Sequence, residues 1–171
     1  MPVLTVHAGR SAPGQRAAAS HTAAIAAPLI TRQALFEQAG IIATASLGEL
    51  LDVAALLAAQ PPPKGGRVAV FTNAGGAGVL AADAAAEAGL TVHKMTPGAQ
   101  RRLAETLSAG AAVAGPVDTG AAVSAEAFRR GLEVAAADEN VGAVLALIVP
   151  TGVADLVQAI RSATCPCRSR R

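Results

Sequence analysis

The sequence predicts an α/β fold in which helices cover both faces of a parallel sheet. Short apolar segments typical of buried strands alternate along the chain with longer segments of helical periodicity. Glycine and proline residues punctuate this alternation. A helix between two strands favours parallel pairing, because that connection returns the chain over the sheet. In such folds, ligands collect beyond the carboxyl ends of the strands.

Composition limits the size and the partners of this fold. The 171 residues suffice for one domain, or for one small domain and part of another. Hydrophobic residues make up 52% and aromatic residues 2%, so Phe36, Phe71 and Phe128 are the expected large anchors of the core. The net charge of +2 indicates no nucleic-acid partner. No segment has the length of a membrane span or the pattern of a signal peptide, which predicts a cytoplasmic protein.

The first piece of the chain, residues 1–59, is expected to form strands at 2–6 and 41–44 and a helix at 28–38. Residues 11–22, rich in Gly, Ser and Ala, are expected to form a loop. Ser46 and Glu49 have the spacing of a capping box, which predicts the start of a second helix. The proline- and glycine-rich segment 60–66 can continue neither helix nor central strand, and it is predicted to be a linker.

The second piece, residues 67–162, repeats the alternation more completely. Strands are expected at 67–72, 90–93 and 143–149, with a loop at 108–120. The expected helices run from the glycine turn to about 89, then over 97–107, 124–138 and 152–162. Residues 163–171 are expected to be a disordered tail. Its Cys165 and Cys167 lack a second ligand pair, so we interpret them as an incidental pair and expect no metal site.

The turn after the strand 67–72 is the first candidate site. Asn73, Ala74, Gly75 and Gly76 lie between this strand and an Ala-rich helical segment. A helix N-terminus has unpaired N–H groups, and its dipole favours negative charge, so the turn suits a phosphate. Glycine turns at this position also occur for packing reasons alone, and that alternative stays open.

The second candidate site is the histidine in Ser20-His21-Thr22. Neutral imidazole is a nucleophile near pH 7, and the nearby Arg10 and Arg16 suit the charge of a phosphoryl group. The alternative is a solvated surface histidine without a chemical role.

Taken together, the two stretches resemble the NDP-forming acyl-CoA synthetases. This succinyl-CoA synthetase-like superfamily includes ADP-forming acetate–CoA ligase. The resemblance covers roughly residues 1–160, and the matching motifs follow the order of the family. They are AGRS at 8–11, AAASHT at 17–22, AGII at 39–42, LGELLD at 47–52, TNAGGAGV at 72–79 and PVD at 116–118.

The resemblance implies a role for each candidate residue. His21 would be the catalytic residue, which carries phosphate between an acyl-phosphate site and a nucleotide site. Asn73 to Gly76 would open one of two helices that face the phosphohistidine, with Arg10, Ser20, Thr22 and Asp118 in support. Residues 67–162 would form a flavodoxin-like domain, preceded in 1–59 by the C-terminal part of the histidine-bearing domain, an incomplete half-domain.

The sequence departs from the family pattern at several positions. Ala23 and Ala27 replace glycines that follow the histidine, which narrows the backbone freedom of that segment. His7 stands where a lysine is common, Gly115 replaces the usual Asn, and Ala77 replaces a common proline.

The family also carries a CoA-binding domain and an ATP-grasp module, and we expect both to be missing partners of this chain. The complete enzyme would use CoA, ADP or ATP and Mg²⁺, none of them expected on this chain alone. The implied function is that of a fragment or subunit that helps to convert acid, CoA and ATP into acyl-CoA, ADP and phosphate. The alternatives are a regulatory module of the kind fused to protein lysine acetyltransferases, or an inactive truncated product. The acyl substrate is not indicated.

Overall fold

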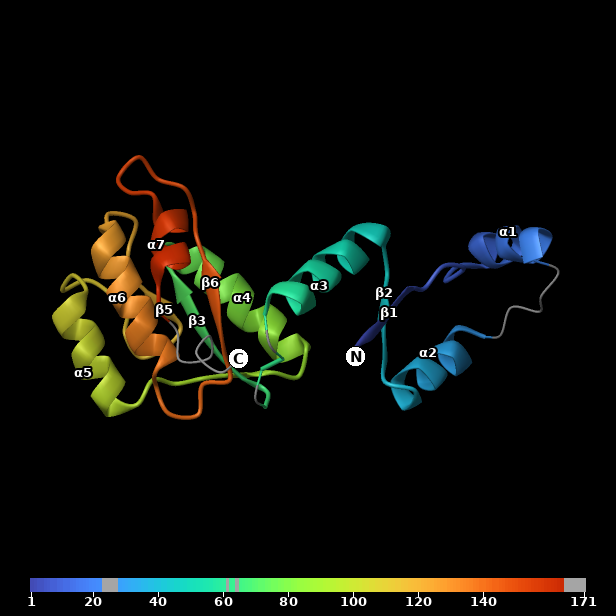
Figure 1. The fold of residues 1–171 in the computed structure, drawn as a ribbon, viewed down its shortest axis with the longest axis horizontal. Helices are drawn as coiled ribbons and strands as arrows, with labels where there is room; N and C mark the ends of the chain where they lie inside the picture. Colours follow the sequence, from blue (N-terminus) through green and yellow to red (C-terminus); the bar gives the residue numbers. More distant parts are fainter. Residues whose placement is uncertain (23–27, 61, 64, 165–171) are drawn as a thin grey trace. The chain divides into compact units, whose positions relative to one another are not determined.

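The computed structural model describes residues 1–22, 28–60, 62–63 and 65–164, with the backbone alone for residues 21 and 22. The chain divides into two compact units, Met1–Pro62 and Pro63–Arg171, which are described separately (Figure 1). Each unit combines parallel strands with helices, which confirms the predicted α/β class. The predicted tail with Cys165 and Cys167 lies outside the described residues.

Unit 1 is a two-stranded parallel sheet with helices. Its elements are β1 (Val3–Val6), α1 (Ala12–Thr22), α2 (Leu29–Gln38), β2 (Ile41–Thr44) and α3 (Leu47–Ala59). The strands pair in register from Val3 with Ile41 to Val6 with Thr44. The carboxyl ends of β1 and β2 therefore lie at the same edge of the small sheet.

The predicted loop over residues 11–22 is wrong, because helix α1 occupies nearly all of it. The Ser11 hydroxyl accepts a hydrogen bond from Gly14 N at 3.3 Å, as an N-cap residue does. Pro13 stands in the first turn, where a missing N–H costs nothing, and the run Ala17 to Ala19 has the highest helix propensity. The Ser11 cap and the alanines favour a helix more strongly than the glycine in this segment favours a loop.

Helix α3 begins at the predicted capping residue, but unit 1 buries little apolar surface. The Ser46 hydroxyl accepts a hydrogen bond from Glu49 N at 3.1 Å, and Glu49 Oε2 accepts one from Ala45 N at 2.8 Å. Neither α2 nor α3 contains a buried residue. Side chains such as Ile30 (76% exposed) and Leu47 (64% exposed) face solvent, so unit 1 has only a small core.

Unit 2 is a four-stranded parallel sheet around β3. Its elements are β3 (Arg67–Thr72), α4 (Gly75–Glu87), β4 (Thr91–Val92), α5 (Pro97–Thr106), β5 (Val117–Asp118), α6 (Ala125–Ala136), β6 (Ala143–Leu147) and α7 (Leu156–Ser162). Strand β6 pairs along most of β3 from Val68 onward, whereas β4 pairs with the start of β3 and β5 with its end. No helix in the described part of the chain is long and apolar enough to cross a membrane.

Unit 2 departs most from the sequence prediction at an unpredicted strand and at the start of the last helix, while β4 and β6 are shorter than expected. The expected loop over residues 108–120 contains β5, whose two residues pair with Phe71 and Thr72. The last helix begins at Leu156 rather than near residue 152, because the Asp155 carboxylate accepts hydrogen bonds from the N–H groups of Val157 and Gln158. Both features depend on individual hydrogen bonds that apolar periodicity does not report.

Helices cover both faces of the sheet in unit 2, as predicted (Figure 1). Thr72 of β3 points toward α4, because a Cβ placed on Gly78 would lie 3.1 Å from Thr72 Cγ2. Phe71 points to the opposite face, where a Cβ on Gly131 of α6 would lie 2.9 Å from its ring. Side chains alternate along a strand, so β3 contributes one set to each layer.

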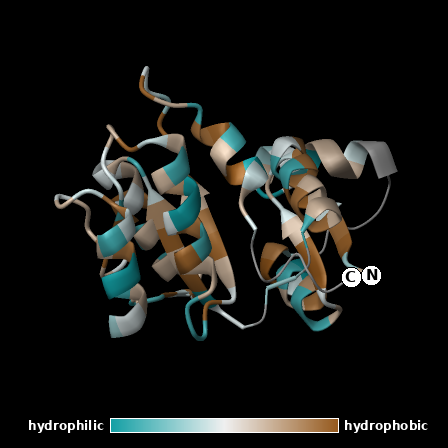
Figure 2. Cartoon of the chain, turned by 60° about the vertical axis from the view of Figure 1, so that its left-hand side comes forward, coloured by the Kyte–Doolittle hydropathy of each residue, from teal (hydrophilic) through white to brown (hydrophobic). Residues whose placement is uncertain are grey.

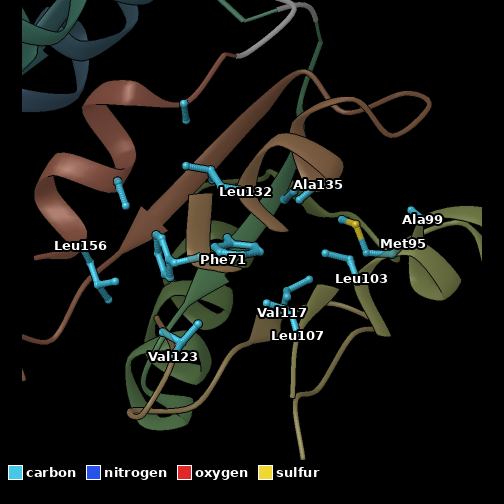
Figure 3. Packing of buried hydrophobic residues seen from close by; sticks show 14 residues of the cluster. Phe71, Met95, Ala99, Leu103, Leu107, Val117, Val123, Leu132, Ala135 and Leu156 are labelled. Atoms are coloured by element: carbon cyan, nitrogen blue, oxygen red, sulfur yellow. The ribbon is translucent and has the colours of Figure 1, made fainter. Parts of the chain in front are cut away.

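The main core lies between the sheet and helices α5, α6 and α7. Phe71 and Phe128 are fully buried and pack edge to face, with ring centroids 5.0 Å apart. Figure 3 shows Phe71 at the centre of the cluster. In Figure 2 the strands of this unit are brown, and teal residues gather on its helices and loops. Two of the three predicted anchors are thus confirmed, while Phe36 in unit 1 is only partly buried.

A buried carboxylate joins α5 to the end of α6. The Asp138 side chain is 2% exposed, and it accepts hydrogen bonds from Thr96 N at 2.8 Å and Thr96 Oγ1 at 2.6 Å. His93 Nε2 lies 3.0 Å from Asp138 Oδ2. Burial alone raises the pKa of Asp138, but the hydrogen bonds from Thr96, His93 and Glu139 outweigh it and hold the pKa below its usual value.

This network predicts an acid-sensitive contribution to stability. A carboxyl group with a lowered pKa in the fold stabilises it above the unfolded pKa of about 3.9, and this stabilisation is lost as the pH falls through the folded value. We expect Asp138→Asn to lower the free energy of unfolding by about 1–3 kcal/mol at pH 7, because the amide cannot accept every bond. Urea unfolding at pH 7 and at pH 3 measures the difference, which should shrink at pH 3. An equal loss at both values would contradict the assignment.

Candidate anion-binding site

The turn between β3 and α4 is held by the side chain of Asn73. Its Nδ2 donates to the carbonyl oxygen of Val149 at 2.8 Å, and its Oδ1 accepts from Val149 N at 2.8 Å. Asn73 is 1% exposed. The residue therefore ties the chain after β3 to the chain after β6 and fixes the point at which α4 begins.

Thr72 makes a second local bond in the same turn. Its buried Oγ1 accepts a hydrogen bond from Ala74 N at 3.1 Å. The N–H of Ala74 is therefore already used inside the protein. Two of the four predicted phosphate ligands, Asn73 by its side chain and Ala74 by its N–H, make these internal bonds.

The N–H groups without a described partner begin at the next residue, Gly75. In the first turn of α4, the N–H groups of Gly75, Gly76 and Ala77 have no hydrogen-bond partner among the described residues. The first intrahelical bond runs from Gly78 N to Ala74 O at 3.1 Å. Ala77 was missed in the sequence, although the rule that the first helical N–H groups stay unpaired would have found it.

Helix α4 differs from the other helices of unit 2 in having no side-chain cap. Thr96 caps α5, Ser124 caps α6 and Asp155 caps α7, each by a side-chain oxygen. The residue before α4 is Ala74, which has no such oxygen. Among the described residues, no side-chain hydrogen bond therefore caps the positive end of the α4 dipole.

The surroundings of Gly75, Gly76 and Gly78 explain in different ways why each position is a glycine. A Cβ on Gly75 would lie 2.9 Å from Asp118 Oδ2, and one on Gly78 would lie 3.1 Å from Thr72 Cγ2. Both glycines therefore permit close packing, which supports the packing explanation for these two positions. A Cβ on Gly76 would meet no atom within 4 Å. Open space thus lies beside Gly76, at the exposed end of the helix.

Asp118, predicted as a supporting residue, borders this site. Its Oδ1 accepts a hydrogen bond from Gly120 N at 3.0 Å, while its Oδ2 lies against Gly75. A carboxylate beside the helix N-terminus is stabilised by the dipole, and it repels a bare anion at short range. A ligand that combines an anionic group with a hydrogen-bond donor fits both features.

The remaining predicted residues belong to unit 1. His21 and Thr22 lie at the end of helix α1, and their side chains are outside the described part of the structure. The Ser20 hydroxyl donates to Ala17 O at 2.7 Å within the same helix. Arg10 is exposed and has no hydrogen-bond partner among the described residues.

Three free donors and the helix dipole at the N-terminus of α4 meet beside open space and suit a phosphoryl group, while the nearby Asp118 carboxylate disfavours a bare phosphate ion. A site for Mg²⁺ needs oxygen ligands placed close together. The described residues contain no group of three His, Cys, Asp or Glu side chains placed to hold an ion, so no Mg²⁺ ligand is assigned.

Comparison with known protein families identifies both units. Residues 1–57 match the succinyl-CoA ligase like flavodoxin domain, and residues 68–160 match the Ligase-CoA domain. Acetate–CoA ligase [ADP-forming] I of Archaeoglobus fulgidus is 39% identical over 94% of this chain. The alpha subunit of acetate–CoA ligase [ADP-forming] II of Pyrococcus furiosus is 39% identical over 88% of it.

A solved structure agrees with these relatives. The dinucleotide forming acetyl-coenzyme A synthetase 1 of Ca. Korarchaeum cryptofilum, in complex with phosphate and ADP, covers 95% of this chain with a TM-score of 0.84 and 31% identity. The chain belongs to the succinyl-CoA ligase-like family of ADP-forming acyl-CoA synthetases, which confirms the predicted resemblance. It spans 23% of the A. fulgidus protein, 33% of the P. furiosus subunit and 36% of the solved chain.

The two hydrogen bonds between Asn73 and Val149 lead to a testable prediction about the site. Asn73→Ala removes two hydrogen bonds, so we expect it to lower the free energy of unfolding by about 1–3 kcal/mol. Hydrogen exchange at the Val149 amide should accelerate, because that N–H loses its acceptor. Gln158→Ala, which also removes an amide from unit 2, is the control and should leave this exchange unchanged. Unaltered exchange at Val149 in Asn73→Ala would contradict the role assigned to Asn73.

Proposed function

We propose that this chain acts as a component of an ADP-forming acyl-CoA synthetase. The complete enzyme would convert an acid, CoA and ATP into acyl-CoA, ADP and phosphate. The observation that supports this proposal most directly is the uncapped N-terminus of α4, with free N–H groups at Gly75, Gly76 and Ala77. These groups would bind the oxygens of a phosphoryl group during its transfer.

In this proposal His21 carries the phosphoryl group as a phosphohistidine. A neutral imidazole nitrogen attacks the terminal phosphorus of ATP, the bond from that phosphorus to the bridging oxygen breaks, and ADP leaves. The phosphoryl group then passes from His21 to the carboxylate of the acid, and the acyl phosphate that forms is attacked by the thiol of CoA. Phosphate leaves as the thioester forms, so atoms and charge balance over the cycle.

Asp118 suits such a carrier better than it suits free phosphate. A phosphohistidine has an anionic phosphoryl group on one ring nitrogen, and its other ring nitrogen carries an N–H when the ring is protonated. At the N-terminus of α4, the oxygens of a bound phosphoryl group would accept from the free N–H groups, and a donor on the same ligand would pair with the carboxylate of Asp118. Arg10, Ser20 and Thr22 would support the histidine segment.

The other parts of the enzyme would come from further domains or subunits. A CoA-binding domain and an ATP-grasp module are the proposed partners, and they would bring CoA, the nucleotide and Mg²⁺. Residues 1–59 are proposed to be the C-terminal part of the histidine-bearing domain, with 60–66 as a linker and 67–162 as the second domain. A cytoplasmic location belongs to the same proposal.

Phosphorylation by labelled ATP tests the proposal. The chain is incubated with ATP labelled at the terminal phosphate, Mg²⁺ and the nucleotide-binding subunit of a relative. We expect acid-labile label on the wild-type chain and on the control His93→Gln, and none on His21→Ala. Equal labelling of His21→Ala would refute the role of His21. Absence of label with any nucleotide-binding partner would refute the ligase proposal and favour a non-catalytic module.

A further inference from the structure

Unit 1 contains a second candidate site, a cavity of about 300 Å³ between α2 and β2. Gln33, Phe36 and Glu37 line it from α2, at the spacing that places side chains on one helix face. Ile41 and Ala43 line it from β2, at alternate positions that share one face of the strand. His7, Arg10, Thr44, Ala45 and Glu49 complete the lining.

The cavity contains opposite charges that are not paired with each other. Arg10 and Glu37 both line it, and no ion pair joins either of them to any residue that the structure describes. Glu49 differs, because its carboxylate accepts a hydrogen bond from Ala45 N at 2.8 Å. One cation and one carboxylate therefore remain available to a ligand.

His7 adds a buried nitrogen that lacks a partner. The residue is 6% exposed, and its Nε2 makes no hydrogen bond to any described residue. Burial lowers the pKa of His7, and the charges of Arg32 and Arg10 lower it further, so the ring is neutral at pH 7. A neutral ring can donate or accept one hydrogen bond at Nε2, and leaving a buried polar atom unpaired is unfavourable.

Beside the polar Gln33 and Thr44, the lining also contains apolar side chains. The ring of Phe36 packs edge to face against His7, with ring centroids 5.5 Å apart. Ile41 and Ala43 add aliphatic surface on the strand side. A ligand that fits the cavity therefore needs an apolar body as well as polar groups.

We propose that this cavity binds a small zwitterion with an apolar side chain, which is the chemistry of a free hydrophobic α-amino acid. Its carboxylate would pair with Arg10 and its ammonium group with Glu37, and His7 Nε2 would gain a hydrogen bond from the ligand. The apolar side chain would pack on Phe36, Ile41 and Ala43. A ligand with a carboxylate alone would form no ion pair with Glu37, and an amine alone would form none with Arg10.

A titration with three matched compounds tests this proposal. L-Leucine, 4-methylpentanoate, which lacks the amine, and 3-methylbutylamine, which lacks the carboxylate, are added to the full chain with isotope-labelled histidine. We expect leucine to shift the imidazole signals of His7 in a saturable manner and to leave those of His93 in unit 2 unchanged. The other two compounds should bind about fivefold more weakly or worse, the effect of one ion pair of about 1 kcal/mol.

A matched pair of variants assigns the contact. In Glu37→Gln, leucine should lose its advantage over 4-methylpentanoate, while Glu105→Gln, which removes an exposed carboxylate in unit 2, should keep it. Equal affinity for leucine and 4-methylpentanoate in the wild-type chain would overturn the proposal. So would unchanged His7 signals at millimolar leucine. Neither outcome requires His21 to be phosphorylated, so a failure here can be told apart from a failure of the proposed function.

Discussion

The pair of hydrogen bonds between the Asn73 side chain and the backbone of Val149 is the constraint on which the candidate anion site depends. It joins the segments that follow β3 and β6 at the carboxyl edge of the sheet. Because both segments are fixed there, the first residue of α4 has a defined position. The N–H groups of Gly75, Gly76 and Ala77 are consequently presented together at the exposed end of the helix.

The missing side-chain cap of α4 supports the proposal that this site binds an anion without a dedicated cationic side chain. The other helices of unit 2 have their N-termini capped by Thr96, Ser124 or Asp155, whereas α4 follows Ala74 and keeps its donors free. An anion at such an end gains about 0.3–1 kcal/mol from the dipole, and more when it is partly buried. Asp118 adds a selective element, because its carboxylate favours an anion that brings a hydrogen-bond donor.

Hydrophobic periodicity was enough to predict most strands and helices, the buried pair Phe71 and Phe128, and the turn after β3. It failed where single hydrogen bonds decide the structure, as in α1, which Ser11 caps, and in the late start of α7, which Asp155 sets. Hydrophobic periodicity also could not predict the roles of Asn73 and Ala74 in the site. The partner of Asn73 is 76 residues away in the sequence, and no local pattern reports a contact over that separation.

The central claim is that the first turn of α4 binds a phosphoryl group through free N–H groups. Titration of the ¹⁵N-labelled chain with inorganic phosphate tests it most directly, with sulfate as a second oxyanion and chloride as the control for ionic strength. We predict shifts of the Gly75, Gly76 and Ala77 amide signals with phosphate that are saturable although weakened by the Asp118 carboxylate, and unchanged signals for the first-turn amides of α6, where Ser124 occupies the same place. Equal small shifts at both helices, or shifts that chloride reproduces, would contradict the claim.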